Sequence, residues 1–168
     1  LAHVPYISDF VERVVIILKG NGVATFELSR VVNLISEYQF STIYHEHYSY
    51  LSLTSLRYVL EGAGLRLFDV QKLATHGGSL RVFVQLPDGG GQEVVSAVDQ
   101  VLNEEERVGV SQRDFYLNFQ EKAEKSRNDF IEFLECAKEE GKRVAGYGAA
   151  AKGNTLLNFA GINTNILI

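Results

Sequence analysis

The sequence predicts an α/β protein: the second half of a doubly wound sheet that finishes with an antiparallel strand, then helices, then the start of a second α/β unit. Three observations predict this. Apolar runs of helix and strand length alternate over residues 1–86, and a Pro/Gly-rich stretch interrupts them at 87–91. A strand-like run then enters a glycine turn at 142–148.

The first elements read as a loop, a helix, a strand and a short helix. Ser8 and Asp9 are expected to cap a helix that ends at Gly20, with apolar residues at helical spacing between them. Residues 22–28 form a short apolar, β-branched run that predicts a buried strand. A short helix is expected over 31–38.

A third helix and two strands should follow. Ser52 or Thr54 is expected to cap the helix, which stops near Gly62. Apolar and polar residues then alternate over 65–70 and again over 80–86, on either side of a glycine-bearing turn. This pattern predicts an antiparallel pair of strands.

Residues 93–140 are predicted to be mostly helical. One long helix is expected from about Gln112 to Glu140, ending at Gly141. It carries an apolar stripe that is typical of core packing, formed by Phe115, Phe119, Ala123, Phe130, Leu134 and Ala137. We interpret the acidic run at 104–106 as a solvated face or a helix end.

The last part of the chain predicts one further α/β unit. Residues 142–148 read as a strand that enters a glycine turn, and residues 149–159 as a helix ended by Gly161. Gly146 and Gly148 fit the loose dinucleotide fingerprint Gly-x-Gly-x-x-Ala. The alternative is a glycine turn that only lets strand and helix pack closely.

The composition predicts a soluble cytoplasmic protein. Hydrophobic residues make up 46% of the 168 residues and charged residues 22%. A net charge of -5 with no basic cluster argues against a nucleic-acid partner.

The longest apolar run, 14–18, is too short to span a membrane, and no signal peptide is recognisable. Cys136 is alone, so we expect neither disulfides nor a cysteine-based zinc site.

The chain also reads as a piece of a longer protein. It has no methionine, begins with Leu-Ala-His-Val-Pro rather than with a start residue, and ends on residues that resemble the start of a strand. We therefore expect a missing N-terminal portion of the same protein as a partner.

Residues 44–50 carry the strongest chemical signal, with two histidines, a glutamate and three tyrosines in seven positions. Imidazole titrates near neutral pH, and a phenol can donate to a developing oxyanion. Acid–base catalysis fits most of these residues, with a histidine as base, Glu46 fixing its tautomer and Tyr44 as oxyanion donor. A His-x-His metal site is the alternative, with Glu46, His76 or His3 as third ligand. The remaining alternative is an ordinary polar strand or loop whose aromatic and imidazole rings are buried.

Two other segments suggest ligand contacts. His76 lies in a Thr-His-Gly-Gly-Ser phrase, where the glycines permit close backbone approach and Ser79 adds a hydroxyl. A tight turn with a solvated imidazole explains this phrase equally well. Lys152 and Asn154 follow the second glycine turn and could add a positive charge and hydrogen bonds at a helix start.

Five phrases together resemble one family, the S-adenosylmethionine-dependent C-methyltransferases of deoxysugar biosynthesis, which act on nucleotide-linked 4-keto sugars. The resemblance covers nearly the whole chain. It is carried by Ala-His-Val-Pro at 2–5, Gly-Val-Ala-Thr-Phe-Glu at 22–27, Phe-Ser-Thr-Ile-Tyr-His-Glu-His-Tyr-Ser-Tyr at 40–50, Thr-His-Gly-Gly-Ser-Leu-Arg-Val at 75–82 and Gly-Tyr-Gly-Ala-Ala-Ala-Lys-Gly-Asn-Thr at 146–155.

The resemblance implies a division of the chain within a class I methyltransferase plan. Residues 1–86 would complete the methyl-donor domain, 87–141 would form a helical connection, and 142–168 would begin the C-terminal α/β domain that holds the sugar nucleotide. The glycine-rich loop that grips S-adenosylmethionine would lie outside this chain. So would the family's N-terminal zinc domain, and we expect no metal at the reacting centre.

The resemblance also implies roles for residues. His47 would be the base, with Tyr44, Glu46 and His3 around the reacting sugar carbon. From their chemistry alone, we expect a second group to orient the sugar nucleotide: His76, Ser79, Gly146, Gly148, Lys152 and Asn154. Three alternatives are a non-catalytic nucleotide-sugar binding module, a nicotinamide-dependent oxidoreductase built on the Gly146 turn, and a His-x-His metal hydrolase.

Overall fold

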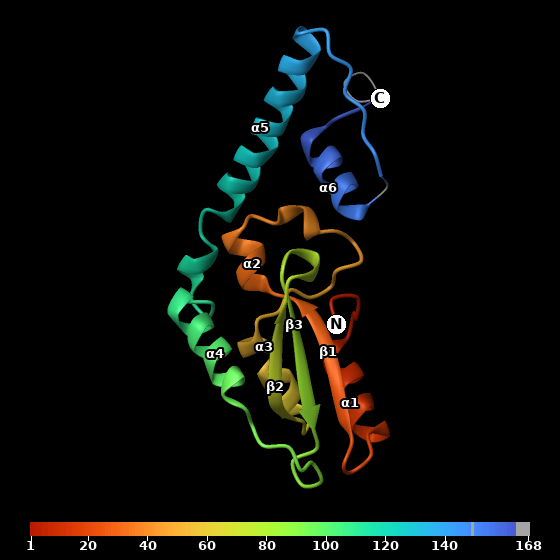
Figure 1. The fold of residues 1–168 in the computed structure, drawn as a ribbon, viewed down its shortest axis with the longest axis vertical. Helices are drawn as coiled ribbons and strands as arrows, with labels where there is room; N and C mark the ends of the chain where they lie inside the picture. The colour runs from red at the N-terminus through yellow and green to blue at the C-terminus, as the bar shows by residue number, and fades with distance from the viewer. Residues whose placement is uncertain (149, 164–168) are drawn as a thin grey trace.

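The computed structural model describes residues 1–148 and 150–163 and shows a mixed α/β fold (Figure 1). A small three-stranded sheet lies at one end, with helices against it. A long helix leads away from the sheet, and the last described helix returns beside it. No helix in the described part of the chain combines the length and apolarity needed to cross a membrane.

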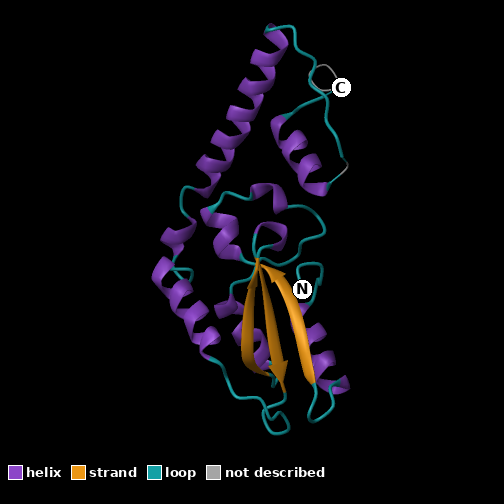
Figure 2. Cartoon of the chain, in the orientation of Figure 1, coloured by secondary structure: helices purple, strands orange, loops and turns teal. Residues whose placement is uncertain are grey.

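The sheet has the order β1-β3-β2, and all of its pairs are antiparallel. Its strands are β1 (Val23–Ser29), β2 (Arg66–Leu73) and β3 (Ser79–Gln85). Because β3 lies between the other two and runs against both, β1 and β2 run parallel to each other (Figure 2). The predicted antiparallel pair, β2 with β3, is confirmed.

The main core lies between the sheet and helices α1 (Ile7–Ile17), α3 (Leu53–Gly62) and α4 (Ser96–Val108). It combines the inward residues of the strands with apolar residues of these helices. Its buried members are Val11, Phe26, Leu28, Leu53, Leu56, Leu60, Leu65, Leu67, Val70, Leu80, Val82, Val84, Val98 and Val101. The predicted Ser52 cap is confirmed, since its hydroxyl accepts a hydrogen bond from the Ser55 backbone N–H at 2.9 Å.

The expected bounds of α1 were wrong by a few residues. The helix begins at Ile7 after Tyr6, which makes no side-chain cap bond, and ends at Ile17 rather than at Gly20. Asp9 does not cap the helix because its carboxylate accepts hydrogen bonds from Arg13, one turn further on, at 2.9 and 3.1 Å.

The region expected as one long helix contains a break. A short 3₁₀ turn, η3 (Arg113–Tyr116), precedes α5 (Phe119–Glu139). Asn118 has a left-handed backbone with φ 65°, which an α-helix cannot continue through, so the predicted start at Gln112 is wrong. Ala123, Leu134 and Ala137 of the predicted apolar stripe are buried as expected.

Residues 104–106 lie near the end of α4 (Ser96–Val108), as the helix-end interpretation expected, and Glu106 is exposed. The solvated-face interpretation is wrong for Glu105, which is fully buried. Its carboxylate accepts from the backbone N–H groups of Leu53 and Thr54 at 2.9 and 2.8 Å, and from the Thr54 hydroxyl at 2.7 Å. These donors lie in the first turn of α3, where backbone N–H groups lack helical partners. Glu105 therefore fixes the helix that directly follows residues 44–50.

Replacing Glu105 by alanine should destabilise the protein strongly. It leaves buried donors without acceptors, at a cost of about 1–3 kcal/mol for each group, so we expect a loss of about 3 kcal/mol or more. Urea unfolding measures this loss, with Glu106→Ala as the matched control because Glu106 is exposed. Equal stabilities of the two variants would show that the buried carboxylate contributes nothing.

The last described helix, α6 (Ala151–Ala160), confirms the predicted helix and its end at Gly161, where φ is 66°. Residues 142–148, however, form no strand, so that prediction is wrong. A strand needs a neighbour for its backbone hydrogen bonds, and none of the described segments pairs with this one. Ala149 lies outside the described residues.

Candidate active site

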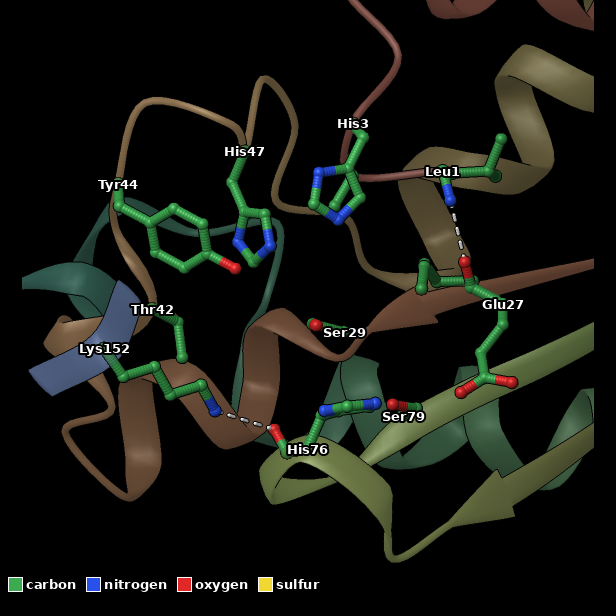
Figure 3. Close-up of a pocket in the computed structure, with 12 residues that line it drawn as sticks. Leu1, His3, Glu27, Ser29, Thr42, Tyr44, His47, His76, Ser79 and Lys152 are labelled. Atoms are coloured by element: carbon green, nitrogen blue, oxygen red, sulfur yellow. Dashed lines mark hydrogen bonds between the residues drawn. The ribbon is translucent and has the colours of Figure 1, made fainter. Parts of the chain in front are cut away.

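A cavity of about 270 Å³ opens where the carboxyl end of β1 meets the start of the chain, the loop before α3 and the start of α6 (Figure 3). Six of the residues singled out from the sequence line it. They are His3, Tyr44, His47, His76, Ser79 and Lys152. The remaining wall residues are Leu1, Ala2, Glu27, Leu28, Ser29 and Thr42.

The loop that carries Tyr44 and His47 is folded as a turn. The His47 backbone N–H donates to the Tyr44 carbonyl at 3.0 Å, and the Tyr48 N–H donates to the Ala2 carbonyl at 2.7 Å. The second bond ties the loop to the start of the chain, which places His3 beside it. Because the segment is not extended, His45 and His47 do not share a face. His47 is half-buried in the cavity wall, while the His45 side chain is 88% exposed.

His47 lies among aromatic rings. The centre of its ring is 4.2 Å from that of Tyr44, 5.0 Å from that of His3 and 5.9 Å from that of Tyr50. Figure 3 shows the Tyr44 hydroxyl directed into the cavity beside the His47 ring. A basic nitrogen and a hydroxyl donor thus face one space, which is the arrangement that proton abstraction next to a carbonyl requires.

Burial lowers the pKa of His47 below its ordinary value of 6.5, and the positive charges of His3 and Lys152 lower it further. The Thr42 backbone carbonyl and the Glu46 carboxylate act in the opposite direction. The net shift keeps the His47 imidazole neutral at pH 7, which is the form that accepts a proton.

Glu46 lies outside the cavity wall, although the sequence placed it at the reacting centre. Its carboxylate lies 4.0 Å from His3 Nδ1 and 3.8 Å from His45 Nε2, and its side chain is 57% exposed. It influences His47 by charge rather than by a direct hydrogen bond among the described residues.

His76 occupies a strained turn, η2 (Thr75–Gly77), between β2 and β3. Its φ of 56° is unusual for a residue with a side chain. Two residues further on, Gly78 has a φ of 102°, which residues with a side chain rarely adopt, and an added Cβ would lie 2.6 Å from the Asn33 side chain. Glycine is therefore required at position 78. The Ser79 hydroxyl donates to the Thr75 carbonyl at 3.2 Å and so holds this turn.

Lys152 connects this turn to α6, since its ammonium group donates to the His76 carbonyl at 3.4 Å (Figure 3). Three other candidates lie elsewhere. Asn154 lines a neighbouring cavity, while Gly146 and Gly148, in the segment before α6, line neither cavity.

Sequence reasoning missed three polar wall residues: Glu27, Ser29 and Thr42. A signal for Ser29 was present, because residues at the carboxyl ends of strands in α/β sheets often face ligands. Glu27 ends the phrase at 22–27, and its carboxylate accepts hydrogen bonds from Arg81 at 3.1 Å and from Thr75 at 3.4 Å. Thr42 lies inside the phrase at 40–50, but nothing in that phrase singled it out.

No three His, Cys, Asp or Glu side chains gather as candidate metal ligands within residues 1–148 and 150–163. At the turn described above, the His47 side chain lines the cavity while the His45 side chain is exposed. The two imidazoles therefore do not face a common metal position.

Fold and cavity together define an α/β protein with a cavity lined by imidazole, phenol and hydroxyl groups. Comparison with known proteins makes this more specific. The family described as C-methyltransferase C-terminal domain matches residues 74–168. Over 161 residues the chain is 38% identical to C-methyltransferase NovU of Streptomyces niveus, an alignment that covers 96% of this chain. The chain belongs to the C-methyltransferase family, and the resemblance noted from its sequence is confirmed. It spans 38% of the length of NovU.

Proposed function

We propose that this chain is part of an S-adenosylmethionine-dependent enzyme that methylates a carbon of a nucleotide-linked 4-keto deoxysugar. The observation that carries the proposal is the His47 ring, held neutral in a cavity at 4.2 Å from the Tyr44 ring. Membership of the C-methyltransferase family supports the reaction class.

The proposed chemistry starts at the carbon next to the sugar ketone. His47 removes a proton from that carbon, and the C–H electrons move onto the ketone oxygen to give an enolate. Tyr44 and His3 donate hydrogen bonds to this oxygen, which makes the proton transfer possible for a weak base. Glu46 favours the imidazolium that results, because its negative charge raises the His47 pKa.

The cavity suits a sulfonium methyl donor on one side. Leu1, Ala2 and Leu28 contribute apolar groups to the wall, and Glu27, which pairs with Arg81, contributes a carboxylate. When bound, S-adenosylmethionine supplies an electrophilic methyl group, which the enolate carbon takes while the donor leaves as a neutral thioether. In the family plan, the loop that grips the donor and the zinc domain belong to other parts of the enzyme.

The proposal also assigns parts of the chain. Residues 1–86, with the β1-β3-β2 sheet, form the end of a class I methyltransferase-type domain, and 87–141 connect it to a nucleotide-sugar domain that begins at 142. In this arrangement His76 and Lys152, which are joined by a hydrogen bond, orient the sugar nucleotide from neighbouring parts of the cavity wall. We place the enzyme in the cytoplasm.

Two of the three alternatives from the sequence, the binding module and the nicotinamide enzyme, gain no support here. A pure binding module does not need a neutral imidazole paired with a phenol. A nicotinamide enzyme built on Gly146 needs a strand before that turn, and residues 142–148 form none.

The direct test gives the complete enzyme a methyl donor with a carbon-labelled methyl group and a nucleoside diphosphate 4-keto deoxysugar. Nuclear magnetic resonance of the product should show the label bonded to a sugar carbon. A label on oxygen, or no transfer to any sugar nucleotide of this class, contradicts the proposal.

The lowered pKa of His47 can be tested without turnover. Because burial is the main cause, we expect the His47 ring resonances to titrate with a midpoint below pH 6.5. In His3→Asn the midpoint should rise, because a positive charge next to the imidazolium is lost. A wild-type midpoint above 6.5, or no rise in the variant, would contradict this account of the site.

A further inference from the structure

Tyr50 ends the phrase at 44–50, and the proposed proton transfer gives it no role. It is half-buried and lines neither of the two cavities that border Tyr44. The centre of its ring nevertheless lies 5.9 Å from that of His47. A phenol that is close to the base but does not face the substrate space can affect the reaction only through the groups that it holds in place.

The Tyr50 ring has a rigid support. It packs against a second apolar cluster, whose buried members are Val31, Val32 and Val110. The residue after Tyr50 is fixed as well, because the Leu51 carbonyl accepts a hydrogen bond at 3.1 Å from the Val31 backbone N–H, at the start of α2 (Val31–Ser36). Tyr50 is therefore anchored independently of the turn at 44–47.

The Tyr50 hydroxyl reaches back across the loop to a backbone carbonyl. It donates a hydrogen bond at 3.3 Å to the Thr42 carbonyl, eight residues earlier in the chain. Thr42 is buried at the end of the 3₁₀ turn η1 (Phe40–Thr42). Its backbone N–H and its hydroxyl both donate to the Gln39 carbonyl, at 3.0 and 2.8 Å, so the Thr42 peptide is fixed in direction. The bond from Tyr50 thus closes the loop that carries His47 between two fixed points.

The Thr42 carbonyl also acts on His47, which lines the same cavity (Figure 3). Burial lowers the pKa of His47 and the Thr42 carbonyl opposes this, because its oxygen favours an imidazole N–H. Burial in turn raises the pKa of Tyr50 above its ordinary value of 10.0, so the Tyr50 hydroxyl stays protonated and remains a donor. A carbonyl oxygen has two lone pairs and can serve both groups.

We propose that Tyr50 is a positioning residue for the proton transfer, an inference that rests on the proposed function. Its hydroxyl holds the Thr42 carbonyl toward the His47 ring, and that carbonyl takes the imidazole N–H. In a neutral imidazole one nitrogen donates and the other accepts, so the second nitrogen is left to take the proton from the sugar carbon. The Thr42 carbonyl thereby performs the tautomer-fixing task that the sequence suggested for Glu46.

The test compares Tyr50→Phe with the wild type in the complete enzyme. The substitution removes one hydroxyl and leaves the ring in the second apolar cluster. With saturating methyl donor and a nucleoside diphosphate 4-keto deoxysugar, kcat should fall about 3- to 10-fold, the effect of losing one neutral hydrogen bond from the transition state. The KM of the sugar nucleotide should not change, because Tyr50 does not face the substrate space.

The tautomer itself can be observed without turnover. Nuclear magnetic resonance of nitrogen-labelled histidine, at a pH above the His47 titration, should show one ring tautomer in the wild type and a mixture of both in Tyr50→Phe. The matched control is Tyr116→Phe, because the Tyr116 hydroxyl also donates to a backbone carbonyl, that of Val110 at 2.7 Å, but lines neither cavity. This control should keep the wild-type kcat and the single tautomer.

The outcomes separate this inference from the proposed function. A Tyr50→Phe enzyme with wild-type kcat and a single tautomer overturns the positioning role and leaves the proposed function standing. Equal losses of kcat in Tyr50→Phe and Tyr116→Phe, or a raised KM with unchanged kcat, also overturn it. If the wild type methylates no sugar nucleotide of this class, the proposed function fails, and the nitrogen spectra alone then decide: a mixture in Tyr50→Phe supports the hold on His47, and a single tautomer overturns it.

Discussion

In the complete enzyme, His47→Ala is expected to lower kcat by about 10²- to 10⁴-fold, the usual contribution of a positioned general base. The reason is geometric, because the His47 ring lies 4.2 Å from the Tyr44 ring, whose hydroxyl faces the same cavity. Binding of the sugar nucleotide should change little, since the base acts on the transition state rather than on substrate affinity. Steady-state kinetics with saturating methyl donor measures both effects.

Added imidazole separates loss of the base from loss of the fold. His47→Ala leaves a space in the cavity wall, and free imidazole should restore part of kcat there. The matched control is Tyr44→Phe, whose base is intact, so imidazole should not help it. An His47→Ala enzyme with wild-type turnover, or equal rescue of both variants, would remove His47 from the role of base.

Tyr44→Phe is expected to lower kcat by about 10²- to 10³-fold, the range found when one donor to an oxyanion is removed. The substitution deletes only the hydroxyl, which Figure 3 shows facing the cavity. The phenyl ring keeps its packing against His47 at 4.2 Å, so the fold and the His47 environment are retained. The ratio of turnover numbers for variant and wild type gives the size of the effect.

Tyr48→Phe is the matched control for this prediction. Tyr48 lies in the same loop, but its side chain is exposed and lines neither cavity. Its loss of a hydroxyl should leave kcat unchanged. Similar losses in the two tyrosine variants would indicate that the loop, and not the Tyr44 hydroxyl, is being tested.

Much of the site could be predicted because its residues are chemically distinctive. Proton-handling side chains at 44–50 have no common folding role at that density, and glycines next to His76 indicated an unusual backbone. The antiparallel strand pair could be predicted because alternation of apolar and polar residues reports directly on a sheet with one buried face.

The parts that failed depend on contacts between distant residues. Nothing near Glu105 in the sequence shows that its carboxylate meets the start of α3, 52 residues away along the chain. The break before α5 rests on the left-handed backbone of the single residue Asn118, which the periodic apolar pattern does not report. Residues 142–148 needed a neighbouring strand that local pattern cannot supply. The position of Glu46 outside the cavity follows from the turn at 44–47, which brings His47 inward and directs Glu46 toward His3 and His45.

The most direct measurement of the central claim follows the proton alone. The complete enzyme is incubated in deuterated water with its 4-keto sugar nucleotide and S-adenosylhomocysteine, so that no methyl group can be transferred. Nuclear magnetic resonance should show deuterium entering the carbon next to the ketone in the wild type, and little or none in His47→Ala. Exchange at an undiminished rate in the variant would contradict the account, because some other group would then be removing the proton.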